Sequence, residues 1–171
     1  MFNFDFYNPT RILFGKGRIA DLNKQVPQQA RVLVLYGGGS VKTTGTLTEV
    51  LHALGDRVVS EFAGIEPNPS YETLMQAVEI VKREKIDFLL AVGGGSVIDG
   101  TKFIAAASVF DGDCRDILKT RGGTIKNTLP IGVVLTLSAT GSEMNNGGVV
   151  TVKSTHTKSK KKNEKLFPQF S

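Results

Sequence analysis

Apolar residues are arranged along the chain as short, largely continuous runs separated by segments with helical periodicity. Six segments are predicted to form strands: 10–14, 31–36, 57–62, 87–92, 129–137 and 148–152. The runs at 31–36 and 87–92 are apolar almost throughout rather than alternating. Such continuity is typical of strands that are buried on both faces of a parallel sheet.

Helices are predicted between these strands. One apolar helical face is formed by residues spaced at i, i+3, i+4 and i+7: Leu47, Val50, Leu51 and Leu54. Asn68 and Pro69 are predicted to begin the next helix, as its N-cap and first-turn proline. Two more helices are predicted at 97–109 and 113–119.

The alternation of strands and helices predicts the fold class. At this spacing it favours right-handed βαβ units, and therefore an α/β, Rossmann-like parallel sheet with helices on both faces. A length of 171 residues suits a single domain of this kind. In such sheets ligands bind beyond the carboxyl ends of the strands, so we expect the functional residues there.

The net charge of +5 is concentrated near the end of the chain. Residues 1–152 carry 15 basic and 15 acidic side chains, which does not favour a nucleic-acid-binding body. The excess lies in 153–165, where six lysines accompany one glutamate. We interpret the lysine-rich segment 153–166 as a solvated, flexible segment, and the alternative is that it contacts polyanions.

Several other protein classes are disfavoured by the composition. The single cysteine, Cys114, excludes an internal disulfide framework, and no apolar run reaches the roughly 18 residues of a membrane helix. The N-terminus lacks the pattern of a secretory signal. His52 and His156 are both interpreted as surface residues. We therefore expect a cytoplasmic protein that does not bind membranes or nucleic acid.

Two Gly-Gly-Gly-Ser loops each join a predicted strand to a helix. The first glycine loop contains Gly37, Gly38, Gly39 and Ser40, and the second glycine loop covers residues 93–96. Glycine lets a backbone approach a ligand closely, and a helix N-terminus offers free N–H groups and partial positive charge to a phosphate. Two such loops at one sheet edge favour a phosphate-bearing ligand, and tight turns without a ligand remain the alternative.

Common nucleotide and hydrolase motifs do not fit these loops. The pattern G-x-G-x-x-G would require glycine at Lys42 or Ile98, and in 95–102 the lysine comes one residue too late for a P-loop. Residues 140–144 lack the flanking glycines of a nucleophile elbow.

Polar side chains near the same edge are further candidates for ligand binding. Asp99 falls in the first turn of the helix after the second glycine loop, where it either complements the helix dipole or accepts a hydrogen bond from a sugar. Thr136 lies at the end of the strand predicted at 129–137, and Thr140, Ser142 and Asn145 follow it. They suit a ribose or carboxamide, or serve as turn and cap residues.

Taken together, five motifs resemble the iron-containing alcohol dehydrogenase family, in its NADPH-dependent butanol dehydrogenase and broad aldehyde reductase branch. They are 8–17 (NPTRILFGKG), 36–40 (YGGGS), 66–69 (EPNP), 91–102 (AVGGGSVIDGTK) and 135–145 (LTLSATGSEMN). The resemblance implies that residues 1–171 are the domain that binds the nicotinamide dinucleotide. It also implies a helical C-terminal domain, absent here, that holds a divalent metal, iron or zinc, through one Asp and three His.

The resemblance also implies roles for individual residues. The first glycine loop would face the adenosine ribose and its 2′-phosphate, and Gly94, Gly95 and Ser96 would hold the pyrophosphate. Asp99 would lie near the nicotinamide ribose. The remaining expected contacts to NADP(H) are Asn68, Thr136, Thr140, Asn145 and Lys158.

Three functions therefore remain as expectations, the third being an anion- or nucleic-acid-contacting protein that uses the lysine-rich segment. The first is the cofactor-binding part of a dehydrogenase that transfers hydride between NADP(H) and a primary alcohol or aldehyde, dimeric in its full-length form. The second is a catalytically silent nucleotide-binding module. No residue in this sequence is expected to be catalytic or to bind a metal.

Overall fold

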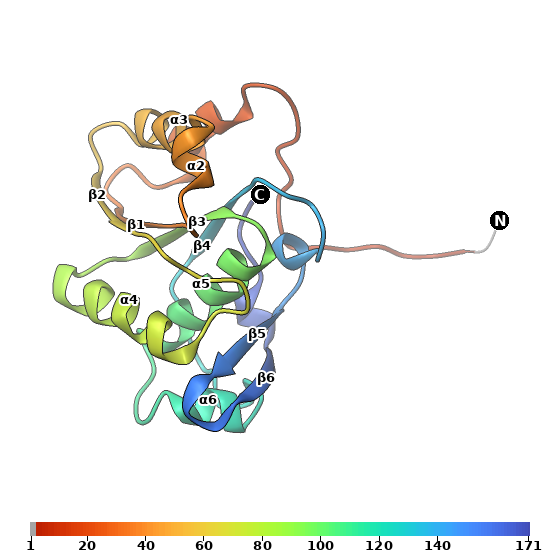
Figure 1. The fold of residues 1–171 in the computed structure, drawn as a ribbon. Coiled ribbons are helices and arrows are strands. Elements are labelled where there is room, and N and C mark those ends of the chain that lie inside the picture. The colour runs from red at the N-terminus through yellow and green to blue at the C-terminus, as the bar shows by residue number, and fades with distance from the viewer. Residues whose placement is uncertain (1–2) are drawn as a thin grey trace.

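A computed structural model describes residues 3–171 as a parallel sheet between two layers of helices (Figure 1). The sheet consists of β1 (Arg31–Leu35), β2 (Val58–Phe62), β3 (Phe88–Gly93) and β4 (Ile131–Leu135). All neighbouring pairs are parallel, in the order β2-β1-β3-β4. The predicted Rossmann-like α/β class is confirmed, and each strand coincides with a predicted segment to within a few residues at its ends.

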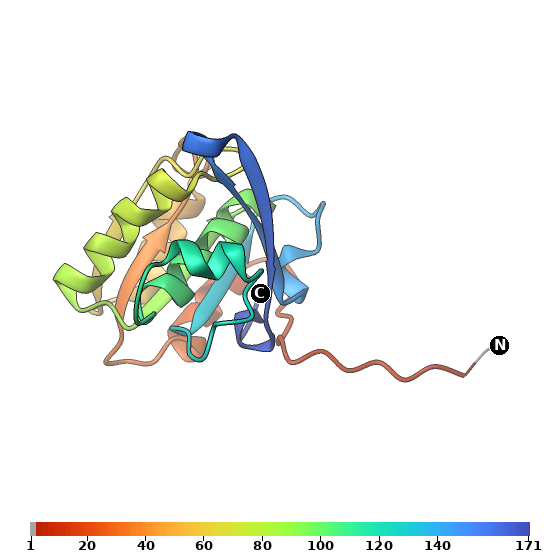
Figure 2. The same cartoon turned by 90° about the horizontal axis from the view of Figure 1, so that it is seen from below.

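Helices cover both faces of this sheet (Figures 1 and 2). One face packs against α1 (Leu22–Gln25), α2 (Ser40–Thr43) and α3 (Thr46–Leu54), and the other against α4 (Tyr71–Glu84) and α5 (Gly95–Ala107). The short α6 (Arg115–Lys119) lies beyond α5. Single 3₁₀ turns occur at Arg18–Asp21, Ser142–Met144, Lys153–Thr155 and Glu164–Leu166. Among residues 3–171, no helix has the length and apolarity needed to cross a bilayer.

Helix α5 is buried on nearly all sides, with 10 of its 13 residues inaccessible to solvent. The sheet covers one side, and α4 and a β-hairpin cover the others (Figure 2). Close packing against α4 depends on Gly100, because a Cβ there would lie only 2.8 Å from the Leu74 side chain. This burial makes α5 a rigid support for the loop that precedes it.

The lysine-rich segment 153–166 contains a strand and is not an unstructured tail, although five of its six lysines are exposed, as expected for a solvated segment. Strand β6 (Thr157–Lys162) pairs antiparallel with β5 (Gly147–Val152), and the hairpin packs on α5. Its residues alternate between two faces, so Lys161 is buried whereas Lys160 and Lys162 are exposed. The alternation is present in the sequence but is concealed because both faces carry lysine.

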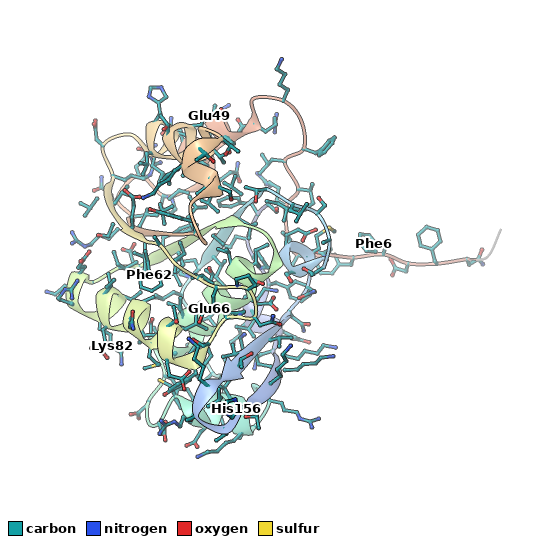
Figure 3. All side chains as sticks on the ribbon, viewed as in Figure 1. Phe6, Glu49, Phe62, Glu66, Lys82 and His156 are labelled. Carbon is teal, nitrogen blue, oxygen red and sulfur yellow. The ribbon has the colours of Figure 1, made fainter. Side chains whose placement is uncertain are left out.

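The strand predicted at 10–14 is reduced to an isolated bridge between Arg11 and Phe170. Its partner is a short extended stretch near the chain end, where Gln169 N donates to the Ile131 carbonyl at the edge of β4. Without a longer partner strand, regular pairing stops there. Residues 3–7 extend away from the body, with the Phe6 side chain exposed (Figure 3).

Helix α4 begins two residues later than predicted. Ser70 is its N-cap, because the Ser70 side chain accepts a hydrogen bond from Thr73 N at 3.3 Å. Asn68 instead adopts a left-handed turn, with φ of 54°. Asn68 therefore stands outside the helix with its side chain available for other contacts.

Glu66 ties the start of α4 to the hairpin (Figure 3). Its Oε1 accepts hydrogen bonds from Ser70 Oγ at 2.6 Å and Thr73 Oγ1 at 3.0 Å, and pairs with Lys153 Nζ at 3.1 Å. Burial alone would raise the pKa of Glu66, but these hydrogen bonds lower it to about 2. The carboxylate therefore stabilises this junction in its charged form.

We expect Glu66→Gln to lower the free energy of unfolding near neutral pH by about 1 kcal/mol, because charge-assisted hydrogen bonds become neutral ones. The contribution of the native carboxylate is present above its unfolded pKa of 4.5 and is lost as the pH falls towards about 2. Urea unfolding across this pH range measures the difference. The exposed Glu79→Gln is the control, and an equal pH dependence in both variants would contradict this role.

Candidate functional site: the two glycine loops

The two glycine loops lie side by side at one edge of the sheet. They follow β1 and β3, which are neighbouring parallel strands. After β1 the chain continues to β2 at one edge of the strand order, and after β3 it continues to β4 at the other edge, so the strand order reverses between β1 and β3. A Cβ on Gly37 would lie 3.8 Å from the side chain of Val97, so the loops are in close proximity. Such a switch point is where α/β sheets bind ligands.

The second glycine loop contains glycines with different structural requirements. A Cβ on Gly95 would overlap the Thr140 hydroxyl, so close packing requires glycine there. Gly94 has φ of −93°, and a Cβ there would meet only Leu137, at 3.8 Å. The fold therefore tolerates a side chain at Gly94, and the space that it would fill is open at the N-terminus of α5.

The first glycine loop also contains one open and one constrained position. Gly39 has φ of 112°, a backbone conformation that strains any residue with a side chain. Gly38 has no positive φ, and a Cβ there would have no neighbour within 4 Å. The nearby cation is Lys42, whose Nζ lies 5.3 Å from the centre of the Tyr36 ring. No carboxylate belongs to the loop itself.

A cavity of about 1200 Å³ adjoins the second glycine loop. Six of the residues predicted as cofactor contacts line it: Asn68, Gly95, Ser96, Asp99, Thr140 and Lys158. Lys158 Nζ donates a hydrogen bond to Asn68 Oδ1 at 3.0 Å, which links β6 to the turn before α4. Residues far apart in the sequence therefore share one space at the start of α5.

Asp99 has one carboxylate oxygen without a partner in this cavity wall. Its Oδ2 accepts a hydrogen bond from Val149 N at 2.9 Å. Its Oδ1 is buried and accepts none among the described residues. A buried acceptor without a donor is costly, so a ligand hydroxyl at this oxygen would be stabilised.

Thr136 and Asn145 lie outside this cavity. Thr136 N donates to the Gly93 carbonyl, and the residue lines a second cavity of about 760 Å³. The Oδ1 atom of Asn145 accepts from Lys102 Nζ at 2.9 Å and from Gly147 N at 3.0 Å. The first glycine loop also lies outside the larger cavity.

Sequence reasoning did not find the buried Lys102 of α5. Its Nζ donates to the carbonyl oxygens of Ser142, Asn145 and Gly147 at 2.7–2.8 Å. Burial lowers the pKa of Lys102 to about 8, against the opposing charges of Asp99 and Glu143. The ammonium thereby fixes the loop that carries Thr140 and Asn145. A lysine directly before the apolar run 103–107 was the available signal.

We expect Lys102→Met to lower the free energy of unfolding by about 2–4 kcal/mol, since it leaves several buried carbonyl groups without their donor. Urea unfolding near neutral pH measures the loss. Lys126→Met, which removes an exposed lysine, is the matched control. Equal stability of the two variants would show that Lys102 does not hold the loop.

The described residues do not form a metal site. Residues 3–171 contain no group of three or more His, Cys, Asp or Glu side chains placed to hold an ion. His156 lies at the tip of the hairpin (Figure 3), and His52 belongs to α3 on the opposite face of the sheet. The residues of this chain therefore do not fit a metal centre by themselves.

Sequence comparison finds long relatives among alcohol and aldehyde oxidoreductases. The chain is 60% identical over 160 residues to the NADPH-dependent aldehyde reductase YqhD of Escherichia coli, covering 92% of this chain and 41% of the relative. It is 48% identical to the probable NADH-dependent butanol dehydrogenase 1 of Bacillus subtilis, covering 100% and 45%. The chain thus spans less than half the length of these relatives.

Structural comparison and a family model lead to the same group. The crystal structure of E. coli YqhD superposes with a TM-score of 0.94 at 57% identity, covering 98% of this chain and 44% of that one. The NADH-dependent butanol dehydrogenase A of Thermotoga maritima gives 0.91 at 40% identity, covering 99% and 43%. The family model described as iron-containing alcohol dehydrogenase matches residues 9–171. The chain therefore belongs to the iron-containing alcohol dehydrogenase family.

Proposed function

We propose that this chain binds NADP(H) across its two glycine loops as the cofactor-binding part of an alcohol dehydrogenase or aldehyde reductase. The observation that carries the proposal is the placement of both loops at the carboxyl ends of β1 and β3, where the strand order reverses. An alcohol or aldehyde substrate and a homodimeric assembly belong to the same proposal, and a cytoplasmic location remains a prediction.

The residues around α5 suit the phosphate and ribose parts of a dinucleotide. Gly94, Gly95 and Ser96 present backbone N–H groups at a helix N-terminus, which favours the pyrophosphate. The unpartnered Oδ1 of Asp99 would accept a hydrogen bond from the nicotinamide ribose. Lys158, Asn68 and Thr140 line the same cavity and would contact the cofactor from the hairpin and loop sides. Thr136 and Asn145, which lie outside this cavity, would contact the cofactor from the opposite wall.

A preference for NADP over NAD is also part of the proposal. The first glycine loop has no carboxylate to repel a 2′-phosphate, and Ser40 and Lys42 offer a hydroxyl and a cation nearby. The names of the relatives include both NADPH-dependent and NADH-dependent enzymes, so the support for NADP comes from the loop chemistry.

When bound, the nicotinamide would accept or supply the hydride that interconverts an alcohol and an aldehyde. The residues described here would bind the dinucleotide, orient it and neutralise its phosphates. No metal-dependent step is assigned to them, since they do not form a metal site. This property favours a second candidate function, cofactor binding without turnover. Incubation of a full-length version with NADPH and an aldehyde separates the two, because only a dehydrogenase would consume NADPH there, whereas this chain alone is expected to bind the cofactor without turnover in both cases.

Fluorescence titration with NADPH tests the proposed binding. We expect saturable enhancement of the cofactor emission, with a dissociation constant below millimolar, and competition by NADP. An excess of inorganic pyrophosphate should weaken binding, because it would occupy the start of α5. No saturable signal up to millimolar NADPH would contradict the proposal for this chain.

A further inference from the structure

Lys161 crosses the hairpin to reach the first turn of α5. Its side chain is 1% exposed, and its Nζ donates a hydrogen bond to the Asp99 carbonyl oxygen at 3.0 Å. Gly148 is its register partner on β5, and a Cβ there would lie 2.6 Å from the Lys161 Nζ. The absence of a side chain at Gly148 therefore creates the space that the ammonium group occupies.

The buried amine has no carboxylate in direct contact. None of the ion pairs among the described residues includes Lys161. The ionisable groups that act on it are Asp99 and Lys102, both on α5, and the neighbouring Lys160 and Lys162 point to the exposed face of β6. Burial lowers the pKa of Lys161 to about 7, Lys102 adds to this effect, and Asp99 opposes it.

The position of this cation relates it to the anion site. Asp99 is the fifth residue of α5, so the Lys161 amine is bonded to the helix backbone about one turn along α5 from the second glycine loop. Lys158, on the opposite face of the same strand, lines the cavity in front of that loop. One strand thus places an exposed lysine before the anion site and a buried lysine behind it.

We propose that Lys161 is a positioning residue whose buried ammonium group adds positive charge to the anion site at the start of α5, and that its amine takes up a proton when an anionic dinucleotide binds. This inference rests on the proposed function, since it presumes that the cofactor phosphates lie at the second glycine loop.

The expected pH dependence of cofactor affinity follows from the charge state of Lys161. In the free protein Lys161 is charged below about pH 7 and neutral above it. A bound polyanion favours the charged amine, so affinity is highest below about pH 7 and falls as the pH rises through and beyond that value. Lys102, with a pKa of about 8, contributes a second fall that persists without Lys161.

Stability should change in the opposite direction from binding. The unfolded chain binds a proton at Lys161 up to its ordinary pKa of 10.5, whereas the folded chain releases it at about 7. The buried amine therefore destabilises the free protein below pH 10.5, and Lys161→Met should raise the urea midpoint at pH 7. If Lys161 had only a structural role, its substitution would instead lower the stability of the protein.

Calorimetric titration with NADPH, at a pH slightly above 7 and in two buffers of different ionisation enthalpy, tests the inference. The parent should take up a fraction of a proton per cofactor. Lys161→Met should lose most of this uptake and bind about tenfold more weakly at pH 6, with a raised urea midpoint. Gly148→Ala, which displaces the amine, should reproduce the weaker binding, whereas Lys162→Met, an exposed change on the same strand, should match the parent.

Four results would overturn the inference. Unchanged proton uptake in Lys161→Met would show that another group titrates. A lowered urea midpoint with weaker binding would show that the lysine only holds the hairpin. Absence of binding by the parent would contradict the proposed function itself and the inference with it, whereas binding without linkage contradicts the inference alone.

Discussion

Gly94→Val is expected to weaken NADPH binding at least about 100-fold while the fold is retained. A charge-assisted hydrogen bond contributes about 1.5–3 kcal/mol, so the loss of two phosphate contacts accounts for this factor. The backbone at Gly94 has φ of −93°, and its Cβ would meet only Leu137 at 3.8 Å, so valine fits the free protein. The branched side chain would instead occupy the space proposed for the pyrophosphate.

Fluorescence titration with NADPH measures the loss of affinity, and urea unfolding measures whether the fold is retained. Ala63→Val is a matched control, because it adds bulk at an exposed position after β2 on the same edge of the sheet. The control should bind like the parent. If Gly94→Val also folds and binds like the parent, the pyrophosphate does not lie at the second glycine loop.

Gly38→Asp is expected to remove or reverse the preference for NADP over NAD. The parent should favour NADP by at least about 10-fold, because one or two charge-assisted hydrogen bonds to a 2′-phosphate contribute about 1.5–3 kcal/mol each. A carboxylate in the loop would repel that phosphate and accept hydrogen bonds from the ribose hydroxyls of NAD. Gly38 is the suitable position because its Cβ has open space, whereas φ of 112° at Gly39 would strain any substitution.

Competitive titration of NADP against NAD measures this preference. Gly38→Asn is the control, since it has nearly the shape of aspartate but no charge, and it should retain part of the preference for NADP. Equal affinities for both cofactors in the parent, unaltered in Gly38→Asp, would remove the first glycine loop from the cofactor site.

The parallel sheet could be predicted because its strands are buried on both faces. Val32, Val34 and Leu90 are completely inaccessible to solvent, and such burial requires the continuous apolar runs visible in the sequence. The two glycine loops could be placed because the carboxyl ends of parallel strands meet at one edge. The shared cavity of Asn68, Asp99 and Lys158 followed only from the resemblance to the family, since no local pattern links these positions.

Other features depend on tertiary contacts that leave no local pattern. Strand β6 was missed because lysine is depleted in strands, and the buried Lys161 is accommodated only by the glycine across the hairpin. The role of Lys102 depends on carbonyl groups about 40 residues away in the chain. Ser70 could not be distinguished from Asn68 as the N-cap, since both residue types cap helices well.

The most direct test of the account is the map of backbone amides whose NMR shifts change when NADPH is added to the chain. We predict that the changes concentrate in both glycine loops (residues 37–40 and 93–96), in the first turn of α5 up to Asp99, and around Thr140. Saturable changes confined to other surfaces, or to only one of the glycine loops, would contradict the conclusion that the two loops together hold the dinucleotide.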